Sequence, residues 1–139
     1  AKMFKADATL TKGGVDTWLF LNFHITNSSS FNPNDALSFK VNIPAKQDVK
    51  NQLLVIVKEK NGGDFVSETG VFLNEVGSKT IYVPFKKLRL AGWSKDNDGI
   101  LDVKNIEDIR IGWGGYLGSE GENILFSSSP PELITLKFQ

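Results

Sequence analysis

The sequence predicts an all-β protein, an antiparallel β-sandwich of the jelly-roll type with about eight strands. Nearly every apolar run is short, rich in β-branched and aromatic residues, and bounded by Gly, Asn, Asp, Ser or Pro, which is the pattern of strands and turns. No stretch shows the helical period over a useful length, apart from one possible helical turn at residues 85–90. These observations favour a two-layer β fold over any fold that contains packed helices.

Eight segments carry the strand pattern, and they are, in order, residues 3–10, 17–25, 36–43, 53–57, 65–73, 79–85, 105–113 and 132–138. The fourth segment is apolar on both faces, so we expect it to be a central strand. A turn at residues 61–63, Asn-Gly-Gly, predicts a hairpin between the fourth and fifth segments.

The second segment alternates strictly, and alternation divides a strand between two faces. One face carries Leu19, Leu21, Phe23 and Ile25, and the other carries Trp18, Phe20, Asn22 and His24. The seventh segment alternates in the same way, with Ile109, Ile111 and Trp113 against Asp108, Arg110 and Gly112. Residues 114–123 contain four glycines and therefore predict a loop.

Composition limits the possible partners and compartments. The 139 residues fit one domain, 1–139. The charges of sixteen basic and sixteen acidic residues cancel, so no overall field attracts nucleic acid or an anionic membrane. We also expect a monomer. The longest apolar run, 53–57, is too short to span a bilayer. There is no cysteine and no recognisable signal peptide, and a chain that starts at Ala1 is expected to be a mature or excised piece.

Catalytic residues are scarce. The chain has one histidine, His24, and no cysteine or Gly-x-Ser-x-Gly motif, so nucleophilic catalysis is poorly supported. Glu120 and Glu122 could act as the carboxylate pair of a glycosidase, but both lie in a glycine-rich segment that is more typical of a solvated loop. We therefore expect a protein that is not an enzyme.

Asp96 and Asp98 lie in an Asp-Asn-Asp-Gly turn that resembles the start of a calcium loop, because hard cations prefer clustered oxygen ligands. The twelve-residue pattern does not continue: with Gly99 at its sixth position the last position is Asn105, and a glutamate, Glu107, is reached only when the count starts at Asp96. We expect no required cofactor, and a structural Ca²⁺ ion at Asp96 and Asp98 is one possibility.

Aromatic residues give the strongest functional signal. A sugar ring presents an apolar C–H face with hydroxyls at its rim, so flat aromatic rings beside Arg, Asn or acidic side chains suit it. We expect Trp18, Arg110, Trp113 and Tyr116 to share one side of the sandwich, although Trp113 would need a bend at Gly112 or Gly114 to face outward. The candidate ligand-binding residues are Trp18, Phe20, Asn22, His24, Trp93, Arg110, Trp113, Tyr116 and Glu120.

Residues 79–110 resemble the jelly-roll carbohydrate-binding modules with a galactose-binding-like fold. The resemblance lies in the order of a strand (TIYVPF), a basic link (FKKLRLAGW), an Asp/Gly loop and the run GILDVKNIEDIRI. Such modules are attached to bacterial plant-cell-wall hydrolases. The resemblance implies a secreted, extracellular, non-catalytic module that binds a β-linked polysaccharide (glucan, mannan or xyloglucan) and targets a covalently linked glycoside hydrolase to it; many such modules bind a structural calcium ion.

Two other functions stay open. One is a small jelly-roll glycanase or lyase that uses Glu120 or Glu122, and a reducing-sugar assay would reveal it. The other is a structural or adhesive β-sandwich that uses the same surface for a protein partner.

Overall fold

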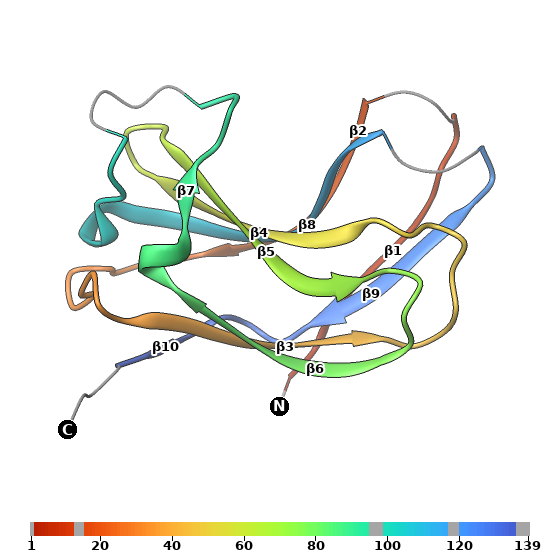
Figure 1. The fold of residues 1–139 in the computed structure, drawn as a ribbon, viewed down its shortest axis with the longest axis horizontal. Coiled ribbons are helices and arrows are strands. Elements are labelled where there is room, and N and C mark those ends of the chain that lie inside the picture. The colour runs from red at the N-terminus through yellow and green to blue at the C-terminus, as the bar shows by residue number, and fades with distance from the viewer. Residues whose placement is uncertain (1, 13–15, 95–98, 117–119, 136–139) are drawn as a thin grey trace.

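The computed structural model describes residues 2–12, 16–94, 99–116 and 120–135, without the side chains of 16, 115 and 116 (Figure 1). Ten strands form two antiparallel sheets in this part of the chain. Sheet A contains β1 (Phe4–Thr9), β9 (Asn123–Ser128), β3 (Ala36–Ile43), β10 (Glu132–Ile134) and β6 (Gly77–Pro84). Sheet B has the order β2 (Asp16–His24), β8 (Ile106–Tyr116), β4 (Gln52–Glu59), β5 (Asp64–Phe72) and β7 (Arg89–Leu90).

The antiparallel jelly-roll sandwich predicted from the sequence is confirmed. The strand β4 lies third of five in sheet B and forms the predicted hairpin with β5. The predicted helical turn is a short 3-10 helix, η1 (Phe85–Lys87), and a second one, η2 (Val103–Asn105), precedes β8. No helix in the described part of the chain is long and apolar enough to cross a membrane.

The predicted loop at residues 114–123 is wrong at both of its ends, and a strand that begins there is absent from the predicted set. The strand β8 continues through Gly114 and Gly115 to Tyr116, where a loop was expected, because β2 pairs with β8 as far as that point. Residues 123–128 form β9, a strand absent from the predicted set. Its alternation places Ile124 and Phe126 in the core, each 1% exposed.

The core fills the space between the two sheets, and the alternating positions of the long strands supply it. Val41, Ile43, Val55, Ile109 and Ile111 are all 0% exposed.

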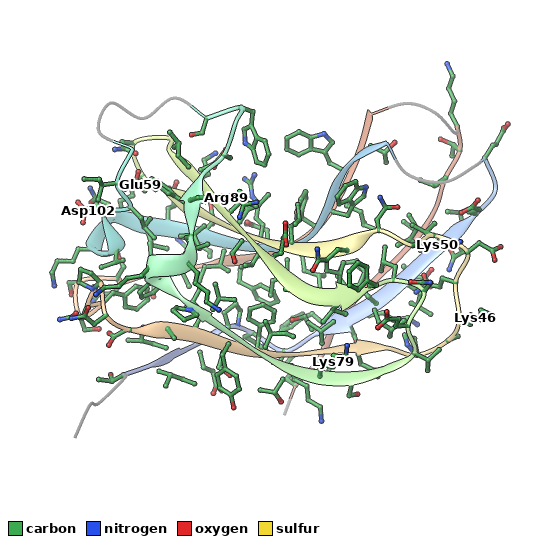
Figure 2. The ribbon with its side chains drawn as sticks, viewed as in Figure 1. Lys46, Lys50, Glu59, Lys79, Arg89 and Asp102 are labelled. Carbon is green, nitrogen blue, oxygen red and sulfur yellow. The ribbon has the colours of Figure 1, made fainter. Side chains whose placement is uncertain are left out.

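A buried carboxylate closes one end of this core. Glu59 and Asp102 lie together there, and Lys46 and Lys50 lie at the other end of the sandwich (Figure 2). The Glu59 carboxylate is 1% exposed, and its Oε2 accepts a hydrogen bond from the Asp102 N–H at 2.7 Å.

Sheet B is curved. The strands β2 and β8 rise on one side of β4 and β5, and β7 rises on the other (Figure 1). The face of sheet B that points away from sheet A is therefore concave, and we call it the concave face. The register of β2 and β8 determines which residues lie side by side on this face: Phe20 pairs with Gly112, Asn22 with Arg110, and His24 with Asp108.

Candidate functional site

The strand β2 divides its side chains as its alternation predicts. Leu19, Leu21 and Phe23 pack against the core between the sheets. Consequently Trp18, Phe20, Asn22 and His24, which are one position out of phase with them, lie on the concave face. This placement of four predicted ligand-binding residues agrees with the sequence analysis.

Two tryptophans from distant parts of the chain meet on the concave face. The rings of Trp18, from β2, and Trp93, from the segment after β7, have centroids 6.2 Å apart and planes inclined at 62°. Phe20 contacts Trp18 in the same edge-to-face manner, at 6.2 Å and 67°. The two indoles remain about half exposed, at 55% for Trp18 and 51% for Trp93, so each offers a ring surface to a ligand.

A small apolar cluster lies on the same face as these rings. Ile56, Val66 and Ala91 are buried there, and Phe20 and Leu54 pack against them. The outer face of an antiparallel sheet is normally polar, so apolar residues at these positions need another explanation. Because these three residues are only 2–7% exposed, they do not themselves meet a ligand. They support Phe20, which in turn contacts Trp18.

Trp93 is fixed by a hydrogen bond that the sequence analysis missed. Its Nε1 donates to Asp64 Oδ2 at 3.0 Å, and Asp64 stands on β5 beside the apolar cluster. The backbone N–H of Asp64 in turn donates to the Ser94 hydroxyl oxygen at 2.8 Å. These two bonds hold the segment after β7 against β5 and determine where the Trp93 ring lies.

Glycines on β8 provide the space for the rings. A Cβ at Gly112 would overlap the Leu19 carbonyl oxygen and lie 2.8 Å from Phe20 Cα. A Cβ at Gly114 would be 3.4 Å from ring atoms of both Phe20 and Trp18. Gly112 therefore allows the close approach of β2 to β8. Gly114 has no side chain, so the rings of Phe20 and Trp18 can lie against its backbone.

Beside the aromatic residues runs a chain of polar contacts between β2 and β8. Arg110 Nε donates to Asn22 Oδ1 at 3.1 Å, and Asn22 Nδ2 donates to Asp108 Oδ1 at 3.4 Å. His24 Nδ1 lies 3.1 Å from the same Asp108 oxygen. Asp108 is the second residue that the sequence analysis missed; its place opposite His24 depends on the register of β2 and β8.

The expectation that Trp113 turns outward is wrong. Trp113 pairs with Leu19 and packs against the core between the sheets, because β8 keeps strict alternation through Gly112 and Gly114. Trp113 therefore lies on the opposite side of sheet B from Trp18 and Arg110. The backbone of Tyr116 pairs with Asp16 at the end of β8, and its side chain lies outside the described residues.

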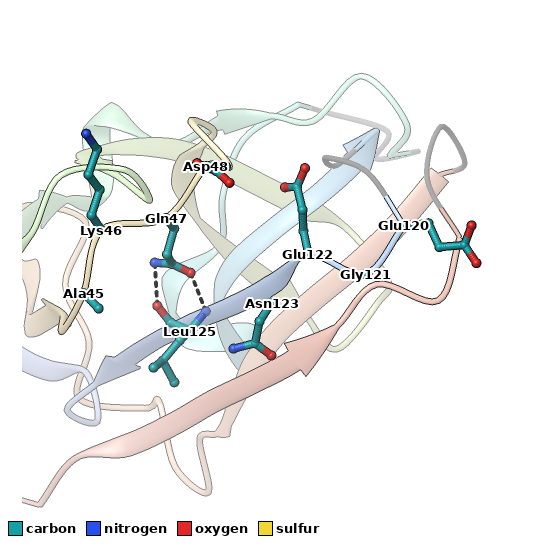
Figure 3. A pocket seen from close by; sticks show the side chains of 9 residues that line it. All are labelled: Ala45, Lys46, Gln47, Asp48, Glu120, Gly121, Glu122, Asn123 and Leu125. Carbon is teal, nitrogen blue, oxygen red and sulfur yellow. Dashed lines mark hydrogen bonds between the residues drawn. The ribbon is translucent and has the colours of Figure 1, made fainter.

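Glu120 lies away from this set. It is exposed and lines a hollow of about 590 Å³ together with Glu122 and residues 45–48 (Figure 3). None of the concave-face residues lines that hollow. Gln47 closes its floor: Nε2 donates to the carbonyl oxygens of Leu125 and Leu73 at 2.8 and 3.0 Å, and Oε1 accepts from Leu125 N–H at 2.6 Å (Figure 3).

Asp96 and Asp98, the predicted calcium ligands, lie outside the described residues. Within the ranges that the structure describes, no three His, Asp or Glu side chains are grouped so as to hold a metal ion.

The concave face thus combines two exposed indoles, a buried apolar cluster beneath them and a row of hydrogen-bonding groups. The exposed rings can cover the C–H face of a sugar, while Arg, Asn, Asp and His groups can donate to or accept from its hydroxyls. The arrangement suits recognition of an amphipathic ligand.

No family model matches the sequence, and no curated protein matches it. Solved structures match the fold. A family 11 carbohydrate-binding module of a cellulosomal cellulase of Clostridium thermocellum matches with a TM-score of 0.60 and 17% identity, over 97% of this chain and 82% of that one. A family 11 module from the same organism, in complex with a β-1,3-1,4-mixed-linked tetrasaccharide, matches with a TM-score of 0.62 and 16% identity, over 96% of this chain and 82% of that one.

An agarase also matches, with a TM-score of 0.62 and 11% identity, over 96% of this chain and 22% of the agarase. The chain therefore has the jelly-roll sandwich fold of these carbohydrate-binding modules, which confirms the resemblance seen in residues 79–110 at the level of the fold.

Proposed function

We propose that this protein is a non-catalytic carbohydrate-binding module that holds a β-linked plant polysaccharide (a glucan, mannan or xyloglucan) on its concave face. One observation carries the proposal. Two half-exposed indoles meet edge to face at 6.2 Å on the solvent side of a sheet, where a buried apolar cluster supports Phe20 beside them. A soluble protein rarely keeps such a surface without a ligand or partner for it.

The polar row makes the surface selective for a hydroxylated ligand. Arg110 presents a planar fork of donors, and one of these donors, Nε, is used by Asn22. The His24 Nδ1 faces Asp108, so the Nε2 atom across the ring is directed away from that carboxylate. Hydroxyls of a glycan chain lying along β2 and β8 would thus meet donors and acceptors in succession.

The inclination of the rings supports a single chain as the ligand. Planes inclined at 62° and 67° do not form one flat platform, which the face of a crystalline polysaccharide would need. A separate, twisted chain can contact such rings one after another.

In the full-length protein we propose that the module keeps a covalently linked glycoside hydrolase on its substrate, as a secreted, extracellular monomer. The match covers 22% of the agarase chain. A domain of this fold within a longer enzyme chain is the arrangement that we propose for the full-length protein. Neither nucleic acid nor a membrane is among the proposed partners.

Glycan recognition is proposed to need no cofactor, so EDTA should leave the affinity unchanged. A structural calcium ion at Asp96 and Asp98 stays a prediction. Its test is a rise in thermal midpoint on adding calcium, which the substitution Asp96→Asn should remove.

Isothermal titration against soluble mixed-linked glucan, glucomannan, mannan and xyloglucan tests the proposal, and binding to none of them would refute it. A reducing-sugar assay on the same ligands should show no release of sugar. Retention on a polysaccharide gel that free sugar reverses would argue against a protein partner as the ligand of this face.

A further inference from the structure

A second hollow lies at the open edge of sheet B, where the concave face ends. It has a volume of about 330 Å³ and is lined by Phe4, residues 21–25, Pro130 and Pro131. This volume lies at the lower end of the roughly 300–1,000 Å³ of ligand pockets. Four consecutive residues of β2 and Ile25, directly after it, line the hollow, which means that the hollow follows the edge of the strand rather than one of its faces.

The backbone of β2 offers hydrogen-bonding groups to this hollow. Ile25 N–H donates to the Glu107 carbonyl oxygen on the β8 side at 2.8 Å. In an antiparallel pair, successive residues direct their N–H and C=O groups to opposite sides. The peptide groups of Asn22 and His24 are therefore directed to the open edge, where β2 has no neighbouring strand among those that the structure describes.

The walls of the hollow are apolar and firmly placed. Phe4 contacts Phe23 edge to face at 5.6 Å, and Phe4 is 37% exposed. Pro130 and Pro131, which also line the hollow, follow Ser129, whose N–H donates to the Lys40 carbonyl oxygen at 2.9 Å. A proline pair has fixed φ angles, so this wall is formed before any ligand arrives.

We propose that this hollow receives a single sugar substituent that branches from the polysaccharide on the concave face. The inference rests on the proposed function. Asn22 and His24 connect the two regions, because their side chains lie on the concave face and their peptide groups are directed to the hollow. Apolar walls suit the C–H face of the sugar, and the peptide groups suit its hydroxyls. The ligand is therefore a substituted chain.

An extended peptide is the other ligand that could use an open strand edge. Prolines beside an edge hinder the addition of a strand, and here Pro130 and Pro131 face β2 across a hollow that Phe4 also lines. The space between these walls fits one small ring better than a continuing chain.

The test compares linear and branched ligands on the same backbone by isothermal titration. One pair is a linear β-1,4-glucan oligosaccharide and a xyloglucan oligosaccharide; another is a linear mannan oligosaccharide and its galactosyl-substituted form. For at least one pair the wild type should bind the branched ligand about tenfold more tightly. The variant Phe4→Ala should lose this preference and keep its affinity for the linear ligand.

Phe4→Tyr retains the ring and should retain the preference for the branched ligand. If Phe4→Ala loses the preference and Phe4→Tyr keeps it, the loss comes from the missing ring and not from misfolding. Tyr82→Ala is the matched control, because Tyr82 is an exposed aromatic residue, 63% exposed, on sheet A. It should bind both ligands as the wild type does.

Failure of this inference differs from failure of the proposed function. If linear ligands bind and the wild type has no preference for branches, or if Phe4→Ala keeps that preference, the substituent site is refuted alone. Binding of no ligand at all refutes both proposals. The NMR chemical shifts of the Asn22 and His24 backbone amides can be followed with both kinds of ligand. A response to an extended Thr-Val peptide and none to the branched sugar would show that the edge binds an added strand, and would overturn the inference.

Discussion

Trp18 and Trp93 contact each other across the concave face, with ring centroids 6.2 Å apart, although β2 and β7 lie at opposite sides of sheet B. The Trp18 ring rests against Gly114 of β8, and the Trp93 ring is held through Asp64 of β5. The pair therefore depends on the placement of four separate parts of the chain, and a ligand that stacks on it contacts a preformed surface.

Substitution of Trp18 by alanine should weaken polysaccharide binding by more than about thirtyfold, because a stacking aromatic at a hot spot contributes at least about 2 kcal/mol. The thermal midpoint should change little, since the side chain is 55% exposed. Titration and calorimetry measure the two quantities. Tyr82→Ala, on sheet A, is the control, and a Trp18→Ala protein that loses stability but keeps its affinity would contradict the assignment.

Trp93→Phe should lower the affinity by about fivefold, since an aromatic ring is kept but the hydrogen bond to Asp64, worth about 1 kcal/mol, is lost. Asp64→Ala should have a similar effect if it acts by positioning Trp93. A double-mutant cycle checks this: the double variant should bind no worse than either single one. Additive losses would show that Asp64 contacts the ligand independently.

Gly112→Ala should lower the free energy of unfolding by about 1–3 kcal/mol, the usual cost of forcing extra atoms into a packed region, because the new Cβ meets the backbone of Leu19 and Phe20. Urea denaturation measures the change. Gly114→Ala should cost less stability, since its Cβ meets only side-chain rings at 3.4 Å. Equal stability of Gly112→Ala and the wild type would disprove this account of the β2–β8 contact.

Arg110→Lys should weaken binding by about tenfold, because lysine keeps the charge but loses the planar fork and the bond to Asn22. Arg89→Lys is the matched variant: Arg89 is 62% exposed and makes a long ion pair with Glu68 at 3.8 Å, so its replacement should change the affinity little. Reversal of these two results would move the binding region from β2 and β8 toward β7.

Alternation predicted both faces of β2 and the core-side residues of β3, since each depends only on local sequence. The same rule places Trp113 in the core, and the expected bend at Gly112 or Gly114 is not formed because β2 continues the pairing across both glycines. The strand β9 is absent from the predicted set; its six residues begin at Asn123, the last residue of the glycine-rich segment for which a loop is predicted.

The partners of the site residues could not be predicted in the same way. The contact of Trp93 with Trp18 joins residues far apart in the chain. The bond to Asp64 positions Trp93, and Trp93 itself lies in a segment without any periodic pattern. The pairing of Asp108 with His24 requires the register of two strands distant in sequence. Contacts of this kind depend on tertiary structure, which a single strand pattern does not encode.

Gln47 has a consequence for how the protein behaves at high concentration. β9 pairs with β1 along one of its edges. Along the first half of its other edge it has no neighbour among the described strands, because β3 pairs only with Ser127 and Ser128. The Gln47 amide bonds to both the N–H and the C=O of Leu125 there, as a neighbouring strand would. It therefore occupies backbone groups that could otherwise pair with a strand of another copy of the chain, which is how exposed sheet edges aggregate.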